Sequence, residues 1–168
     1  MKKILLISDT HGHIDNVILK YAKKADLVIH AGDIGDIDVI DKLSKVSSLK
    51  AVFGNIDDQL LRSQFKKNLV FYCEEVKVLI THIGGYPDKY NPKLKKLLLD
   101  EKPQIYICGH SHILKVISDK KLNLIHMNPG AAGINGFHKI RTMIRFTINK
   151  KEIQNLEVVE LGPRGKII

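Results

Sequence analysis

The sequence is poor in the residues that build disulfide frameworks, thiolate metal sites and aromatic binding surfaces. It has two cysteines, no tryptophan and 6% aromatic residues in 168 positions. Cys73 and Cys108 are far apart in the sequence and each lies within an apolar run. This excludes a disulfide miniprotein and predicts two reduced thiols in the core. The scarcity of aromatic side chains leaves few surfaces on which single-stranded nucleic acid could stack.

Long apolar runs are also missing near the start of the chain. The run at 4–7 is interrupted by Ser8 and Asp9, so it is too short for a signal peptide or a membrane span. We therefore expect a soluble, cytoplasmic protein with no membrane partner. The length of 168 residues and the hydrophobic content of 44% suit one domain, which we expect to occupy residues 1–168.

Positive charge is in excess, with 27 lysines and arginines against 18 aspartates and glutamates, a formal net charge of +9. Such a balance is typical either of a solvated basic surface or of a surface that binds polyanions. Most basic residues are scattered lysine pairs, and only four are arginines, the side chain best suited to bidentate phosphate recognition. The distribution favours a solvated surface. Arg141 and Arg145, which alternate along a late strand, are also predicted to lie at the surface.

Hydrophobic periodicity divides the chain into a parallel part and a largely antiparallel part. Early strands are predicted at 4–8, 27–30 and 50–53, and helices at 14–24, 36–46 and 59–65. This order favours adjacent parallel strands with right-handed crossovers. Later, a helix at 93–100 is predicted among strands at 70–74, 76–81, 104–108, 114–118, 123–126, 141–148 and 153–160. The sequence thus predicts a mixed α/β (α+β) fold of two sheets, partly parallel and partly antiparallel, with flanking helices.

Potential metal ligands lie at or just past the ends of five predicted strands. Ligands bind outside the carboxyl ends of strands in open α/β sheets, so we expect these side chains to meet at one rim. The predicted metal ligands are Asp9, His11, Asp33, Asn55, His82, His110 and His112. Their nitrogen and oxygen donors suit Mn²⁺, Fe²⁺, Co²⁺, Ni²⁺ or Zn²⁺ rather than a structural thiolate zinc site.

Seven ligands exceed what one ion needs if positions are to stay open for a substrate, so two divalent ions are predicted. Their combined charge requires a bridging anion. Asp33, in the middle of the ligand order, and a hydroxide could together supply it. The hydroxide would then be the nucleophile.

The ordered series of motifs resembles the metallophosphoesterase (calcineurin-like) superfamily. The motifs are Asp9-x-His11-Gly12, Gly32-Asp33, Gly54-Asn55, His82 and Gly109-His110-x-His112. The short length and Asn128-Pro129-Gly130 resemble its small YfcE-type phosphodiesterase branch. The resemblance implies a four-layer αββα sandwich of two mixed sheets, with a dinuclear metal site at the strand C-terminal edges.

The same resemblance implies a division of the ligands between two ions, with Mn²⁺ as the metal expected first. One ion would be held by Asp9, His11 and His112, the other by Asn55, His82 and His110, and Asp33 would bridge both. The resemblance also implies a homo-oligomer.

One position departs from the family pattern. In most of the superfamily Gly-Asn is followed by a histidine that is thought to protonate the leaving group, and here Ile56 takes that place, although Asp57 remains. Proton donation contributes about 10² to 10⁴ in rate, so alkoxide leaving groups should suffer and phenolate-like ones should not. His13, His138 or a metal-bound water could replace the missing acid. The predicted catalytic residues are Asn55, His13 and His138.

The predicted function is a metal-dependent phosphodiesterase in which a metal-bridging hydroxide attacks a small phosphate ester. One alternative is a phosphomonoesterase, a small nuclease or a cyclic-nucleotide phosphodiesterase, with nucleic acid the less favoured partner. The other is a non-catalytic scaffold of the same fold, as in the retromer subunit. The intact ligand set counts against the scaffold, whereas Ile56 counts for it.

Overall fold

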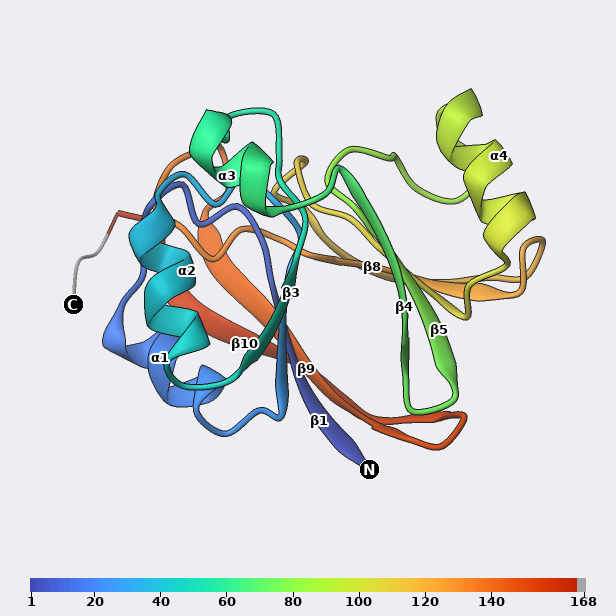
Figure 1. Ribbon diagram of the computed structural model, residues 1–168, viewed down its shortest axis with the longest axis horizontal. Helices are drawn as coiled ribbons and strands as arrows, with labels where there is room; N and C mark the ends of the chain where they lie inside the picture. The colour runs from blue at the N-terminus through green and yellow to red at the C-terminus, as the bar shows by residue number, and fades with distance from the viewer. Residues whose placement is uncertain (166–168) are drawn as a thin grey trace.

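The computed structural model describes residues 1–165, which form two five-stranded sheets and four helices (Figure 1). The elements are β1 (Lys2–Ile7), α1 (Asn16–Ala22), β2 (Leu27–His30), α2 (Ile37–Ser44), β3 (Ser48–Ala51), α3 (Gln59–Gln64), β4 (Asn68–Cys73), β5 (Val76–Thr81), α4 (Pro92–Glu101), β6 (Ile105–Ile107), β7 (Leu114–Asp119), β8 (Leu124–Pro129), β9 (Ile140–Asn149) and β10 (Glu152–Pro163).

Both sheets are mixed. The first has the order β10-β9-β1-β2-β3, in which β1, β2 and β3 run parallel and β9 pairs antiparallel with β1. The second has the order β4-β5-β6-β8-β7, with a parallel centre of β5, β6 and β8 and antiparallel strands at both edges. The predicted pair of mixed sheets is confirmed.

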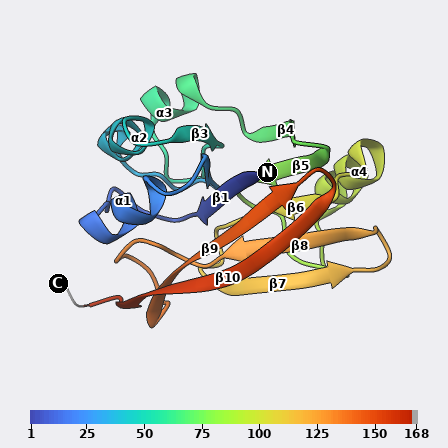
Figure 2. The same cartoon turned by 90° about the horizontal axis from the view of Figure 1, so that it is seen from below.

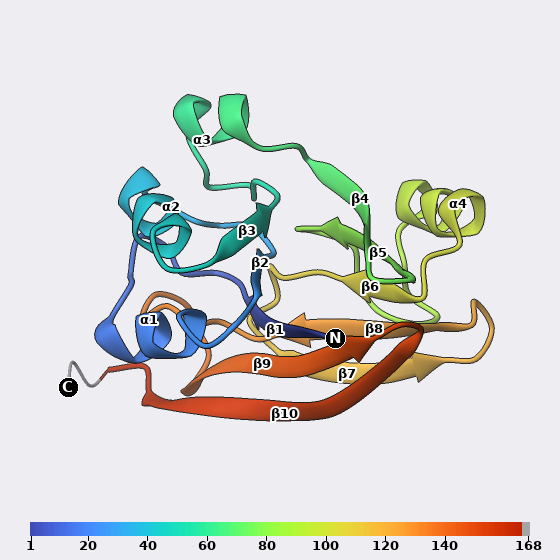
Figure 3. The same cartoon turned by 60° about the horizontal axis from the view of Figure 1, so that its bottom comes forward.

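Successive side chains of a strand point to opposite faces of its sheet, and this divides the molecule into four layers. In β1, Ile4 and Leu6 join the apolar layer between the sheets, whereas Leu5 and Ile7 join the core beneath α1 and α2. On the second sheet, α4 packs Leu94 against the outer face. Figure 2 and Figure 3 show α1 and α2 on one side of the molecule and α4 on the other. The predicted αββα sandwich is confirmed.

The helices begin after polar caps, so the first two start later than the periodicity predicts, and both also end two residues earlier than predicted. Asp15 accepts the backbone N–H of Ile18, so α1 starts after it and not at position 14. Asp36 caps α2 in the same way, and Asp58 and Asn91 cap α3 and α4. Among residues 1–165, no helix has the length and apolar content needed to cross a membrane.

The structure confirms the predictions for two cysteines and for Arg145 but not the prediction for Arg141. Both cysteines are buried free thiols, as predicted, and burial raises the pKa of Cys108 to about 12. The surface position predicted for Arg141 is wrong, because its side chain donates to the carbonyl of Ala132 at 2.8 Å and to Asp15 at 2.7 Å. Arg145 is exposed, as predicted. Arg141 is buried because it ties the start of α1 to β9.

Candidate metal centre

The parallel strands bring the predicted ligands to one rim. The loops after β1, β2 and β3 end at one edge of the first sheet, and the loops after β5 and β6 meet them there. The backbone N–H of His110 donates to Asp9 Oδ2 at 3.1 Å, and that of Gly109 donates to the carbonyl of His82 at 3.0 Å. The first bond joins the two sheets at the rim, and the second joins the loops after β5 and β6 within the second sheet.

The side chains at this rim form two clusters, in each of which the possible ligand atoms lie within 4.8 Å of one another. The first cluster is Asp9, His11 and His112, and the second is Asp33, His82 and His110. Asn55 joins the second cluster, because its Oδ1 lies 3.1 Å from His82 Nε2 and 2.9 Å from His110 Nδ1. The structure therefore brings together all seven predicted ligands.

Asp33, a member of the second cluster, also faces the first cluster. Its Oδ2 is 3.7 Å from His11 Nε2 in the first cluster, and its Oδ1 is 3.2 Å from His82 Nε2 in the second. Burial raises the pKa of Asp33 and lowers that of His82, but their mutual contact and the other hydrogen bonds and charges around them together outweigh burial. The pKa of Asp33 ends below its usual value, and its carboxylate is therefore charged at neutral pH.

The hydrogen bonding of the Asp9 carboxylate indicates that the rim suits a cation. Its Oδ2 accepts hydrogen bonds from Ser8 Oγ and from the His110 backbone. Its Oδ1 is buried, has no hydrogen-bond partner within residues 1–165, and lies 3.1 Å from His112 Nε2. A buried carboxylate oxygen without a donor is costly unless a cation lies beside it. The donor set of the rim therefore fits divalent metal ions.

The backbone at the rim adopts unusual conformations. Five of the seven ligand-type residues have left-handed φ values: Asp9 54°, His11 47°, Asp33 52°, His110 68° and His112 56°. Each such residue costs on the order of 1–3 kcal/mol, and such strain clusters at functional sites. Position 54, directly before Asn55, requires a glycine because a Cβ there would overlap the Asp33 carboxylate. The glycines of the motifs let the ligand loops approach closely.

Hydrogen bonds fix which nitrogen each of two predicted ligand histidines, His82 and His112, presents to its cluster. His82 donates from Nδ1 to the carbonyl of Ala31 at 2.8 Å, which leaves Nε2 as its ligand atom. His138 donates from Nε2 to the carbonyl of Gly133 at 3.0 Å, so its Nδ1 can accept the proton of His112 Nδ1 at 3.2 Å. His112 then presents Nε2 to Asp9. This contact makes His138 a positioning residue for His112.

The two histidines predicted as replacement acids lie in different surroundings. His138 adjoins the first cluster, and burial lowers the pKa of its ring, so the ring is neutral near pH 7. His13 Nε2 lies 3.2 Å from Asp15 Oδ2 and forms no hydrogen bond or ion pair with the seven ligand-type residues in the described chain. The role of general acid stays a prediction for both.

Three residues that support the rim were not predicted as site residues. Asn128, at the end of β8, donates to the carbonyl of Gly109 at 2.9 Å and to Ser111 Oγ at 3.1 Å, which holds the loop of His110 and His112. Asp57 accepts the backbone N–H of Gly54 at 2.7 Å. Arg62 donates to the carbonyl of Asn55 at 3.0 Å. Two features of the sequence could have pointed to this support: the Asn128-Pro129-Gly130 motif and the Asp57 that follows Ile56. No sequence motif indicated a role for Arg62.

His138→Ala is expected to weaken Mn²⁺ binding about 10- to 100-fold, because His112 would lose the bond that orients its ring. Isothermal titration with Mn²⁺ measures this change. His13→Ala is the matched control and should leave the affinity unchanged, since His13 bonds to Asp15. Equal affinities for wild type and His138→Ala would show that His138 does not position His112.

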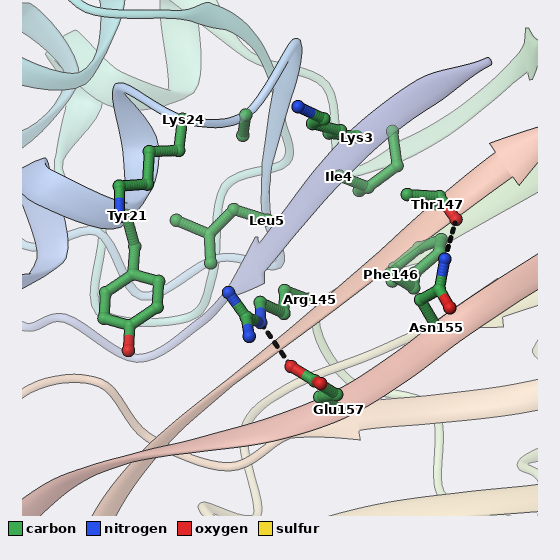
Figure 4. A pocket seen from close by; sticks show the side chains of 11 residues that line it. Lys3, Ile4, Leu5, Tyr21, Lys24, Arg145, Phe146, Thr147, Asn155 and Glu157 are labelled. Atoms are coloured by element: carbon green, nitrogen blue, oxygen red, sulfur yellow. Dashed lines mark hydrogen bonds and ion pairs between the residues drawn. The ribbon is translucent and has the colours of Figure 1, made fainter.

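A separate hollow of about 280 Å³ lies between α1 and the strands β9 and β10 (Figure 4). Its positive Arg145 is paired with Glu157, and Asn155 donates to Thr147 at 3.3 Å. None of the seven ligand-type residues is part of its wall. The candidate metal centre is thus not in this hollow.

Comparisons with known proteins agree with the geometry. Residues 1–151 match a family model described as a calcineurin-like phosphoesterase superfamily domain. A probable metallophosphoesterase of Methanothermobacter thermautotrophicus is 26% identical over 133 residues, which cover 75% of this chain and 74% of that protein.

Solved structures show the same fold. Vps29 from Entamoeba histolytica, in complex with Zn²⁺, superposes with a TM-score of 0.73 at 18% identity and covers 94% of this chain and 98% of its own. A structure described as a novel archaeal phosphodiesterase gives a TM-score of 0.70 at 21% identity, with 94% of this chain and 99% of that chain covered.

Proposed function

We propose that this chain, which belongs to the calcineurin-like phosphoesterase superfamily, is a metal-dependent phosphodiesterase that hydrolyses small phosphate esters. The observation that carries the proposal is the meeting of seven nitrogen and oxygen donors at one rim, with a charged carboxylate, Asp33, between two clusters. A site built only to stabilise the fold would not need a buried carboxylate oxygen, Asp9 Oδ1, that has no hydrogen-bond partner among residues 1–165.

Two sets of side chains would hold the cations, of which Mn²⁺ is the ion we expect first. Asp9, His11 and His112 would form one set, Asn55, His82 and His110 the other, and Asp33 would serve both. Divalent ions there would offset the negative charge of a phosphate and lower the pKa of water.

The chain's own groups would bind and orient the phosphate. Asn55 is exposed, and its Oδ1 faces the two histidines of the second cluster. Its Nδ2 has no hydrogen-bond partner among residues 1–165 and could donate to a non-bridging phosphate oxygen. Arg62 holds the Asn55 carbonyl at 3.0 Å and thereby keeps this loop in place. Asn55 would therefore act both as a ligand and as a phosphate-orienting group.

Ile56 would restrict the leaving groups that the site can release. Its side chain is 47% exposed directly after Asn55, and its backbone N–H donates to Asp33 Oδ1 at 3.1 Å. An isoleucine has no proton to give to a departing oxygen. Esters with phenolate-like leaving groups, which need no protonation, should therefore be the better substrates.

The second candidate function is a non-catalytic scaffold of the same fold. Ile56 in the position of the usual acid supports it, and so does the structural similarity to Vps29. A scaffold could bind metal without turning over any ester. Turnover, measured beside metal content, separates the two candidates.

Removing divalent ions is expected to abolish hydrolysis of bis(4-nitrophenyl) phosphate, and adding Mn²⁺ is expected to restore it. The reason is that, in this proposal, the divalent ions held by the two clusters offset the charge of the phosphate and lower the pKa of the attacking water. Release of 4-nitrophenolate is followed before chelation, after chelation, and after Mn²⁺ is returned. Turnover that survives the chelator would contradict the proposal, and Mn²⁺ binding without turnover would favour the scaffold.

A further inference from the structure

A cavity of about 730 Å³ opens beside the second cluster, and Asn55 and His82 form part of its wall. The remaining walls come from α3, the start of β4, the end of β5 and the first turns of α4. Figure 1 shows α3 and α4 on opposite sides of the ends of β4 and β5. The volume lies within the usual range for small-molecule pockets, about 300 to 1,000 Å³.

The cavity combines apolar surface with positive charge. Phe53, Ile83 and Leu97 contribute apolar surface, and Ile83 is 50% exposed directly after His82. The charged residues of the wall are Arg62, Lys67 and Lys93, and no aspartate or glutamate lines it. Exposed apolar surface beside a reactive centre favours a ligand with an apolar part. The cations favour a negative charge on that ligand.

The three cations have different roles. Arg62 lies 4.8 Å above the ring of Phe53 and donates to the carbonyls of Asn55 and Asp57, so its guanidinium is engaged by the protein. Lys67 and Lys93 form no ion pair within residues 1–165, and both side chains are exposed. The two lysines are therefore the groups available to a ligand anion.

We propose that this cavity binds the non-reacting substituent of the substrate, and that this substituent is an apolar, ring-containing group with a second negative charge. This inference rests on the proposed function. We assign the cavity to a part of the substrate because the cavity is continuous with the metal centre, with which it shares Asn55 and His82. A phosphate held there would direct one ester group into the cavity, toward Ile83 and the two lysines.

Three phosphodiesters with the same 4-nitrophenolate leaving group test the proposal. They are methyl 4-nitrophenyl phosphate, the 4-nitrophenyl ester of thymidine 5′-phosphate, and the same nucleoside ester with an added 3′-phosphate. KM is expected to fall in that order, about 10-fold at each step, with kcat changing less. Equal KM values for the three esters would overturn the proposal.

Variants assign the effect to the cavity. The double variant Lys67→Glu/Lys93→Glu is expected to raise KM about 10-fold for the ester with the 3′-phosphate and to leave KM for the methyl ester unchanged. Lys95→Glu/Lys96→Glu, on α4 but outside the cavity, is the matched control. If both double variants raised KM equally, the change would come from the net charge of the protein and not from the cavity. That result would overturn the assignment of the substituent to the cavity.

A binding measurement separates this inference from the proposed function. Calorimetry with thymidine 3′,5′-bisphosphate needs no turnover. We expect the dissociation constant to rise about 10-fold in Lys67→Glu/Lys93→Glu and to stay the same in Lys95→Glu/Lys96→Glu. If no ester is hydrolysed but this difference is found, the proposed function fails and the cavity assignment stands. If esters are hydrolysed and no difference is found, the cavity assignment fails alone.

Discussion

Asp33→Asn should lower the rate of bis(4-nitrophenyl) phosphate hydrolysis by about 10³-fold with added Mn²⁺. The asparagine has the same size, and its side-chain oxygen can still accept the backbone N–H of Ile56. What disappears is the negative charge between the two clusters, 3.7 Å from His11 Nε2 and 3.2 Å from His82 Nε2. The variant should therefore remain folded while the rim holds cations poorly.

The matched control for this variant is Asp41→Asn. Asp41 lies exposed on α2, and the same change of charge there should leave the rate and the Mn²⁺ content unchanged. Both variants are compared by rate, by bound Mn²⁺ and by thermal unfolding. An Asp33→Asn protein with near wild-type turnover would mean that the carboxylate between the clusters takes no part in the reaction.

Ile56→His should raise hydrolysis of diesters with alkoxide leaving groups by about 10²-fold and change hydrolysis of 4-nitrophenyl esters little. The new imidazole would stand on the backbone that donates to Asp33 Oδ1, next to Asn55. An alkoxide needs a proton as it departs, whereas nitrophenolate does not. The informative quantity is the ratio of kcat/KM for a dinucleotide to kcat/KM for a nitrophenyl diester.

The pH profile adds a second readout for Ile56→His. A histidine that donates a proton must be protonated, so the gain should be lost as the pH rises through about 6.5. Ile113→His is the control, because Ile113 is also an exposed isoleucine and directly follows a predicted metal ligand, His112. An unchanged ratio in Ile56→His, or an equal gain in Ile113→His, would show that position 56 does not face the leaving group.

The meeting of the seven predicted ligands at one rim could be foreseen from the sequence, because it depends only on where each residue lies relative to its strand. Each of the seven residues follows a short apolar strand, and parallel strands bring such positions to one edge whatever the details of packing. Asp9 and His11 therefore met His112, from a loop about a hundred residues away. The two mixed sheets with flanking helices followed from the order of apolar segments, whereas the four αββα layers were implied by the resemblance to the family. In the structure, alternation in β1 separates Ile4 from Leu5 and so divides two of these layers.

What could not be predicted depends on long-range partners or on exact backbone angles. Arg141 reads as a surface residue of an alternating strand, and only the pairing of β9 with β1 brings it to Asp15. The bond between His138 and His112 likewise joins residues that no local pattern relates. The left-handed backbone of the ligand residues, such as Asp33, has no signature in the sequence beyond the neighbouring glycines.

The most direct test of the account is the manganese anomalous signal of crystals grown with Mn²⁺ and phosphate. We expect one peak within the cluster of Asp9, His11 and His112, and a second within the cluster of Asp33, His82 and His110, where Asn55 also lies. Phosphate density should lie against both peaks. Manganese that binds elsewhere, or that cannot be loaded between these side chains, would contradict the account.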